Sequence, residues 1–234
     1  MTQKLSPIIL ALDTDDLDIA KRWVEITAES IDIYKVGLEF FFKHGAKGLR
    51  ELREVRDFQL FLDLKLHDIP NTVSGAVASV RDLSPKFLTV HAAGGKAMIA
   101  AAAQSAPDIS ITAVTVLTSL DAHELEAMGI PQGPLAYALS LAKNSVAAGA
   151  HSIVCSPLEV TAIREVVGAE IELITPGVRP AESDLGDQSR VMTPSQALQA
   201  GANFLVIGRP ITSYFSTSPE AMKERAREIR ESLT

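Results

Sequence analysis

Cysteine is almost absent from this sequence of 234 residues, in which Cys155 stands alone. A single thiol excludes an internal disulfide framework. Long apolar runs are missing as well, since no segment approaches the roughly 18 consecutive apolar residues that suggest a membrane span. The N-terminal stretch MTQKLSPIILALD has one lysine and a short apolar run ending in Asp13, which fits neither a cleavable signal nor an anchor. We therefore expect a cytoplasmic protein that does not contact a membrane.

The sequence also lacks a basic face. Its 22 Lys and Arg residues are scattered and are outnumbered by 29 Asp and Glu residues, for a net charge of -7. Nucleic-acid binding calls for clustered positive charge, so that class of function is not expected, and an anionic ligand has to be held by a few local groups. No metal site is expected, because no HxH or HExxH spacing and no pairing with cysteine occurs among His44, His67, His91, His123 and His151.

Linkers rich in proline, glycine or serine and low-complexity tracts are absent too. With 47% hydrophobic and 22% charged residues, the composition is that of a globular protein, and we expect one domain over residues 1–234. The longest irregular stretch is residues 176–194. Because a loop of this length inside a compact domain is often functional, it is a candidate lid over a binding site.

Eight short apolar runs are present, and each is followed by a segment with helical character. Runs that are apolar throughout suit parallel strands covered on both faces, and PEAMKERAREIRESL near the C-terminus has amphipathic helical periodicity. The alternation predicts a (β/α)8 barrel, the TIM barrel of the α/β class. A doubly wound open sheet is the alternative, but its GxGxxG fingerprint is missing, since the first run leads into DTDDLDIA. The runs are residues 7–12, 31–36, 58–64, 86–91, 109–117, 151–155, 171–175 and 203–208.

Charged residues follow the first three apolar runs, at the strand ends where barrel enzymes collect their chemistry. Asp13 follows the first run, Lys35 lies near the end of the second, and Asp63 and Lys65 end the third. Residues two apart on a strand share a face, so Asp63 and Lys65 should point the same way. We expect all four in one alternating network. Salt bridges that merely cap the barrel are the alternative reading, but burying each ion costs several kcal/mol, which favours a functional role.

The sequence GRPI ends the eighth run. Gly208 permits close approach of the backbone, Arg209 supplies a fork of donors and Pro210 fixes the turn. Loops after the seventh and eighth strands of barrels commonly bind phosphate, although a turn with a surface arginine would have the same sequence. The remaining strand ends carry polar or special residues of less specific meaning, namely His91, Thr118, Ser119, Pro176 and Gly177.

Other candidates are better explained by packing. Cys155 is expected to be a small buried residue, because no base is paired with it. His91 and His151 are interpreted as satisfied core or rim histidines. Trp23 and the FFF run at residues 40–42 are expected to pack between helices.

Five motifs taken together resemble the orotidine 5'-phosphate decarboxylase family of the bacterial type. They occur in the family's order over nearly the whole chain, and DLKLHDIPNT is the most extended of them. A DxKxxD alone is shared by a wider group of phosphate-binding barrels, so the specificity comes from the combination. The motifs are YKVG, DLKLHDIPNT, TVLTS, TPGVRPAESDLGDQSRVMTP and VIGRPI. The chain departs from the family in the link TSYFSTSPEAM, where a smaller and more acidic segment is usual.

The resemblance implies decarboxylation of orotidine 5'-monophosphate to uridine 5'-monophosphate without a cofactor, the last step of pyrimidine nucleotide synthesis de novo. It implies that Lys65 protonates C6 of the base and that Asp63 lies beside the leaving carboxylate. Lys35 would hold Asp63 and a ribose hydroxyl. Asp63 and Asp68 would hold the Lys65 ammonium in place.

The resemblance also implies a homodimer with its active sites at the interface. Asp68, Ile69 and Thr72 would then reach into the site of the partner. Asp13 would bind ribose, and Thr118 with Ser119 would contact the base. The other substrate-binding residues implied are Pro176 and, around the phosphate, Arg179, Gln188, Gly208 and Arg209.

Two alternatives stay open. A magnesium-dependent sugar-phosphate decarboxylase or aldolase of the same barrel group has an acidic metal ligand where this chain has Lys35, and lysine does not coordinate magnesium. A non-catalytic nucleotide-binding barrel would keep Gly208 and Arg209 but would have no need of Lys65 among carboxylates.

Overall fold

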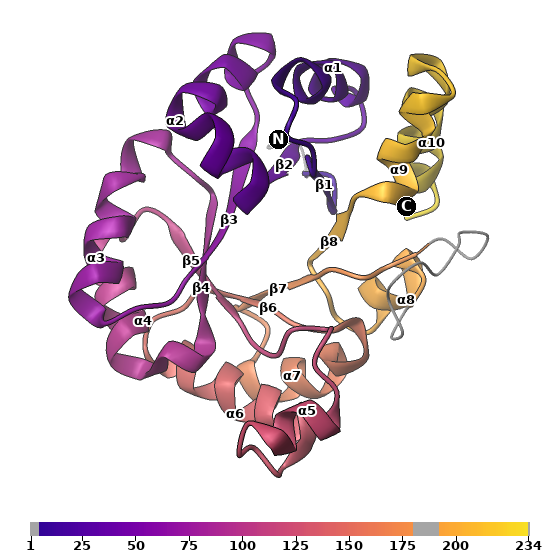
Figure 1. Cartoon of the computed structure of the whole chain (residues 1–234). Coiled ribbons are helices and arrows are strands. Elements are labelled where there is room, and N and C mark those ends of the chain that lie inside the picture. Colours follow the sequence, from indigo (N-terminus) through magenta and orange to yellow (C-terminus); the bar gives the residue numbers. More distant parts are fainter. Residues whose placement is uncertain (1–4, 180–191, 234) are drawn as a thin grey trace.

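The computed structural model describes residues 5–179 and 192–233, and in these residues eight parallel strands form a closed barrel (Figure 1). Each strand pairs with the next in the sequence, and β8 pairs with β1 to close the ring. The predicted (β/α)8 barrel is therefore confirmed. The strands are β1 (Ile8–Ala11), β2 (Ile33–Val36), β3 (Gln59–Leu66), β4 (Phe87–His91), β5 (Ser110–Val114), β6 (Ser152–Val154), β7 (Glu172–Thr175) and β8 (Phe204–Ile207).

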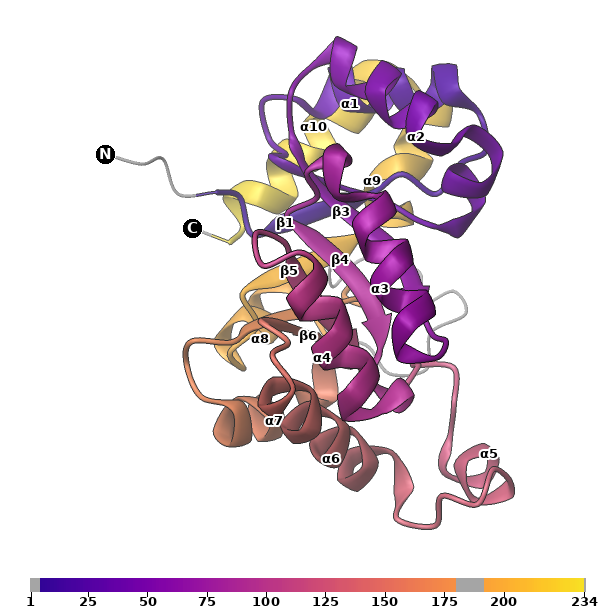
Figure 2. The ribbon, with the colours of Figure 1, turned by 90° about the vertical axis from the view of Figure 1, so that its left-hand side faces the viewer.

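Helices surround the barrel on the outside (Figure 1). The connection from β5 to the next barrel helix carries a short additional helix, α5, which projects from the body of the molecule (Figure 2). No helix among the described residues is both long enough and apolar enough to span a membrane. The α-helices are α1 (Leu17–Thr27), α2 (Leu38–Val55), α3 (Pro70–Ser79), α4 (Gly95–Ser105), α5 (Ala122–Ala127), α6 (Gly133–Ala147), α7 (Val160–Val167), α8 (Pro194–Gln199), α9 (Arg209–Thr212) and α10 (Pro219–Glu231). Single 3₁₀ turns are η1 (Arg81–Leu83), η2 (Ala92–Gly94), η3 (Pro157–Glu159) and η4 (Ser213–Ser216).

The interior of the barrel is filled by a small aromatic and aliphatic cluster, separate from the larger core between strands and helices. Phe87 is at its centre, with its ring centroid 5.7 Å from that of Phe61 and 5.5 Å from that of Phe204, both edge-on. Such pairs add to the roughly 2 kcal/mol that burial of each ring contributes. Val154 and Val206 pack on the cluster. The filled interior gives the open end of the barrel a floor.

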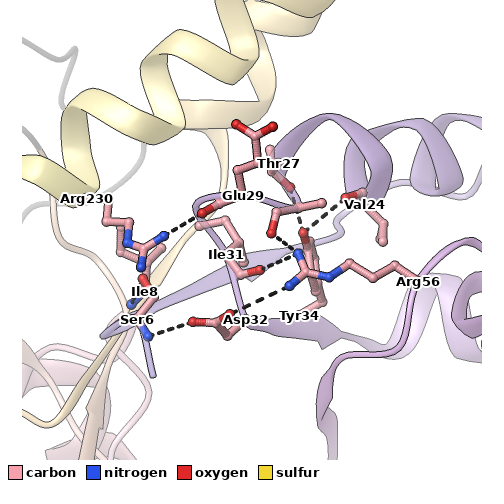
Figure 3. A network of polar contacts seen from close by, with 11 residues as sticks. Ser6, Ile8, Val24, Thr27, Glu29, Ile31, Asp32, Tyr34, Arg56 and Arg230 are labelled. Atoms are coloured by element: carbon pink, nitrogen blue, oxygen red, sulfur yellow. Dashed lines mark hydrogen bonds and ion pairs between the residues drawn. The ribbon is translucent and has the colours of Figure 1, made fainter. Parts of the chain in front are cut away.

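The N-terminal end of the barrel is held by a network of polar contacts around Arg56 (Figure 3). The Arg56 guanidinium donates to the carbonyl oxygens of Ala28 and Ile31, which follow the last turn of α1. It also lies 3.8 Å from the Asp32 carboxylate, which accepts the backbone N–H of Ser6 at 2.8 Å. Carbonyls beyond a helix end have no partner within the helix, and Arg56 supplies one. The network joins the chain before β1, the turn before β2 and the end of α2.

The FFF run packs as expected at only two of its three residues. Phe40 is buried in the core and Phe41 packs against it, but the side chain of Phe42 is 82% exposed. Successive helical residues point about 100° apart, so three in a row cannot share the inward face. The prediction for Trp23 is confirmed, since it is buried with its ring centroid 6.2 Å from that of Phe215. The unusual link after α9 thus packs against α1 through Phe215.

Candidate active site

The third strand is irregular where it reaches the open end of the barrel. Leu62 pairs with Leu88 and Leu66 with Val90, so residues 63–65 of β3 stand opposite one residue of β4. Lys65 has a φ of 47°, in the left-handed region that residues other than glycine rarely adopt. Residues 63 and 65 were expected to share a face because side chains alternate along a regular strand. The strand is not regular here, so alternation does not bring the two side chains together. The bulge does so instead.

The four charged residues form one chain of contacts across three adjacent strands. Lys35 Nζ lies 2.9 Å from Asp13 Oδ1 and 3.7 Å from Asp63 Oδ2. Lys65 Nζ lies 2.8 Å from Asp63 Oδ1. The order Asp13, Lys35, Asp63, Lys65 alternates in sign, as expected from the order of β1, β2 and β3 in the sheet. The structure thus contains the predicted network.

The middle pair of this chain is buried, with side-chain exposures of 11% for Lys35 and 13% for Asp63. Burial by itself lowers the pKa of Lys35, but Asp13 and Asp63 outweigh it and the pKa is raised. Burial by itself raises the pKa of Asp63, but Lys35 and Lys65 outweigh it and the pKa is lowered. Each residue therefore stabilises the charged form of its neighbour, and both stay ionised at neutral pH.

This arrangement predicts a specific pH dependence of stability. Since the pKa of Asp63 is below its ordinary 3.8 in the folded protein, the unfolded chain binds more protons near that pH, and stability rises with pH there. The contribution of ionised Asp63 is present above the ordinary pKa and is lost as pH falls through the lowered one. We expect Asp63→Asn to flatten the rise in unfolding free energy as pH increases from the lowered pKa to the ordinary 3.8. Urea unfolding of both proteins measures this, and equal slopes would contradict it.

A cavity of about 330 Å³ opens above the interior cluster, with Phe61, Val154 and Val206 on its floor. The charge chain forms one side of it. Nine of the residues predicted from the sequence line it: Asp13, Lys35, Asp63, Lys65, Thr118, Pro176, Arg179, Gly208 and Arg209. The closed barrel explains this convergence, because the carboxyl ends of all its strands meet at one face.

Two arginines reach the cavity from the loops after β7 and β8. Arg209 begins α9 and is exposed, and Arg179 is only 9% exposed. The backbone N–H of Arg179 donates to the Met192 carbonyl at 3.0 Å, and Val178 forms an isolated bridge with Met192. This bridge joins the two described ends of the candidate lid. Gln188 and most of the lid lie outside the described residues.

Some of the predicted residues do not line the cavity. Asp68, Ile69, Thr72 and Ser119 are exposed. The Asp68 carboxylate accepts the N–H of the adjacent Ile69 at 2.7 Å, just before α3, and does not belong to the charge chain. Thr118 and Ser119 are neighbours in the chain and were both predicted to contact the base, but of the two only Thr118 lines the cavity. The structure therefore separates these four from the residues that converge.

Thr89 was not among the candidates, because it is uncharged and lies in the middle of an apolar run. It is fully buried on β4 and contacts both members of the pair formed by Asp63 and Lys65. The only signal available in the sequence was a polar residue inside a buried strand.

The histidines and the cysteine differ in how well they fit the packing explanation. His91 is half-buried, its Nδ1 has no hydrogen-bond partner among the described residues, and burial lowers its pKa. The expectation of a satisfied His91 is thus wrong at that nitrogen. His151 is exposed. Cys155 is buried as expected, and burial raises the pKa of its thiol, although the residue also lines the cavity.

The fold and the cavity define the class of the protein: a (β/α)8 barrel with a polar site at the carboxyl ends of its strands, where a chain of lysines and carboxylates and two arginines line one cavity. Comparison with known proteins identifies the family. Residues 6–223 match the orotidine 5'-phosphate decarboxylase / HUMPS family. This chain belongs to that family.

Several relatives carry the same name, orotidine 5'-phosphate decarboxylase. The chain is 53% identical to the protein of Thermobifida fusca over 88% of this chain and 89% of the relative. It is 45% identical to that of Sphingopyxis alaskensis over 97% and 99%. The crystal structure of the enzyme from Lactobacillus acidophilus, 34% identical, superposes with a TM-score of 0.78 and covers 96% of this chain and 99% of that one.

Proposed function

We propose that this protein decarboxylates orotidine 5'-monophosphate to uridine 5'-monophosphate without a cofactor, as the last step of pyrimidine nucleotide synthesis. The observation that carries this proposal is the charge chain from Asp13 to Lys65, which places an ammonium and a carboxylate together at a cavity and whose middle pair is buried. Membership of a family whose relatives bear the name of this activity supports it.

The chemistry requires a fixed cation at C6 of the pyrimidine. When the bond between C6 and the carboxylate breaks, its electron pair stays on C6, where no conjugated system accepts it, and CO2 leaves. We assign Lys65 to this position: its ammonium stabilises the developing charge and then donates a proton from Nζ to C6. Solvent returns a proton to the lysine after product release.

A cation lowers the barrier most when it is oriented before the reaction begins. Asp63, 2.8 Å from Lys65 Nζ, holds the ammonium and lies beside the leaving carboxylate. Lys35 holds Asp63 in turn and donates to a ribose hydroxyl, which Asp13 also binds. In this proposal the network is catalytic because it is rigid and charged before substrate arrives.

The phosphate of the substrate is assigned to the part of the cavity formed by the loops after β7 and β8. Arg209 and Arg179 supply charged donors there, and the backbone of Gly208 leaves the approach open. Gln188 completes the grip from the lid, and Pro176 lies at the lid's start. Thr118 and Ser119 are assigned to the base. Energy from binding a remote phosphate can be used to orient the reacting ring.

We further propose a homodimer in which Asp68, Ile69 and Thr72 complete the site of the partner subunit. Ile69 is 66% exposed in the single chain. A second cavity of about 140 Å³ adjoins the charge chain and is lined by Lys35 and Lys65, which leaves room for a side chain of the partner subunit. Sedimentation equilibrium that finds only monomers at assay concentration would contradict the dimer.

The deciding experiment is the ultraviolet absorbance change when orotidine 5'-monophosphate is mixed with purified protein in excess EDTA. Turnover that ignores EDTA is expected. Turnover that requires added magnesium would point to the sugar-phosphate decarboxylase type, and binding of uridine 5'-monophosphate without turnover would point to a nucleotide-binding barrel.

We place this reaction in the cytoplasm. The lone Cys155 is buried and cannot form an internal disulfide, which suits a reducing compartment. Recovery of the protein mainly from a secreted or envelope fraction would argue against this location.

A further inference from the structure

Thr89 is the residue of β4 that stands opposite the bulge in β3. Its hydroxyl accepts the backbone N–H of Lys65 at 2.8 Å and donates to Asp63 Oδ1 at 3.0 Å. The side chain is fully buried and is not among the described residues that line the cavity. Thr89 therefore does not touch a ligand in the cavity and can act only through its neighbours.

The contacts close into a ring. Asp63 Oδ1 accepts both the Thr89 hydroxyl and, at 2.8 Å, the ammonium of Lys65. The Thr89 hydroxyl also holds the backbone of Lys65. Lys65 is thus held at both ends, by Thr89 at its amide and by Asp63 at its Nζ.

The amide contact matters because the backbone of Lys65 is strained. A φ of 47° is unfavourable for a side chain with a Cβ, and such conformations persist only where the surroundings enforce them. The pairing of β3 with β4 is interrupted between Leu62 and Leu66, so the regular ladder does not enforce this one. The Thr89 hydroxyl takes the place of the missing ladder acceptor.

We propose that Thr89 is a positioning residue for the decarboxylation, whose hydroxyl fixes the left-handed backbone of Lys65 and orients Asp63 so that the ammonium points at C6. This inference rests on the proposed function. The role needs one group that accepts from an amide and donates to a carboxylate at once, which a hydroxyl does and a methyl group does not.

Two variants and a matched control test the inference. Thr89→Val keeps the shape and removes the hydroxyl, and Thr89→Ser keeps the hydroxyl and removes a methyl group. The control is Thr112→Val: Thr112 pairs directly with Thr89, is equally buried, and its hydroxyl makes two hydrogen bonds, to the Ser110 carbonyl and the Ser152 hydroxyl, away from the charge chain. Steady-state kinetics with orotidine 5'-monophosphate and thermal unfolding are measured for each.

We expect Thr89→Val to lower kcat by about tenfold to a hundredfold, the effect of a small misplacement of a reacting group, with KM changed less than about threefold. Thr89→Ser should recover most of kcat, and Thr112→Val should stay within about twofold of wild type even if it is less stable. A Thr89→Val enzyme with wild-type kcat, or one no slower than Thr112→Val, overturns the proposal.

If Thr89→Val does not fold, Thr89→Ala and Thr89→Ser are compared, since they differ only in the hydroxyl. The same difference in kcat is expected between them, and equal values overturn the inference. Absence of turnover in the wild-type protein would instead refute the proposed function, so the two failures are distinguishable.

Discussion

Replacement of Lys65 by alanine is expected to lower kcat/KM for orotidine 5'-monophosphate by at least about 10⁴-fold, or about 5.5 kcal/mol. Both parts of its proposed role are lost at once, because β3 carries no second lysine and alanine has neither a charge nor a proton to donate to C6. Asp63 would also lose its contact at 2.8 Å and, among the described residues, would keep Lys35 as its cationic partner.

The measurement is the absorbance assay with enzyme at high concentration, so that weak residual turnover is visible. Lys143→Ala, which removes an exposed lysine on α6, controls for the general effect of losing a positive charge. Thermal unfolding separates a loss of catalysis from a loss of fold. A Lys65→Ala enzyme within about a hundredfold of wild type would show that the proton and most of the charge stabilisation come from elsewhere.

The second large effect is expected for Arg209→Ala, which should lower kcat/KM by several orders of magnitude. If energy from phosphate binding is used to orient the base, the loss appears in kcat as well as in KM. An effect below about tenfold, about 1.4 kcal/mol, would contradict a role in the phosphate grip.

A truncated substrate makes this prediction sharper. Orotidine, which has no phosphate, gains nothing from Arg209, so wild type and Arg209→Ala should process it equally slowly. Arg50→Ala is the matched control, because Arg50 is exposed on α2 and its ion pair with the exposed Asp82 is long, at 3.8 Å. A variant that is impaired equally with both substrates would indicate a damaged site instead.

The charges at the strand ends could be predicted because a parallel barrel delivers the ends of all its strands to one face. Asp13, Lys35 and Asp63 needed only the strand assignments to be brought together. Lys65 was also correctly predicted to lie beside Asp63, but the bulge that brings the two side chains together could not be predicted from the sequence. A glycine at this position would have suggested a positive φ and hence a bulge, but a lysine does not.

Other features depended on three-dimensional context. The role of Thr89 depends on the residues of β3 that it contacts. A single polar residue in an apolar run does not indicate which residues those are. Ser119 follows Thr118 in the chain but is exposed and does not line the cavity, because neighbouring residues can face opposite ways. Phe42 was judged by its apolar character alone, whereas its place on the helix decides its exposure.

The Arg56 network and the charge chain lie at opposite ends of the barrel, and this has a consequence for engineering. Substitutions far apart without shared partners act independently on stability. The contacts among Arg56, Asp32 and the carbonyls after α1 can therefore be strengthened without disturbing the geometry around Lys65. Substitutions meant to raise the heat tolerance of this protein should therefore be placed at the N-terminal end of the barrel, where added rigidity does not slow turnover.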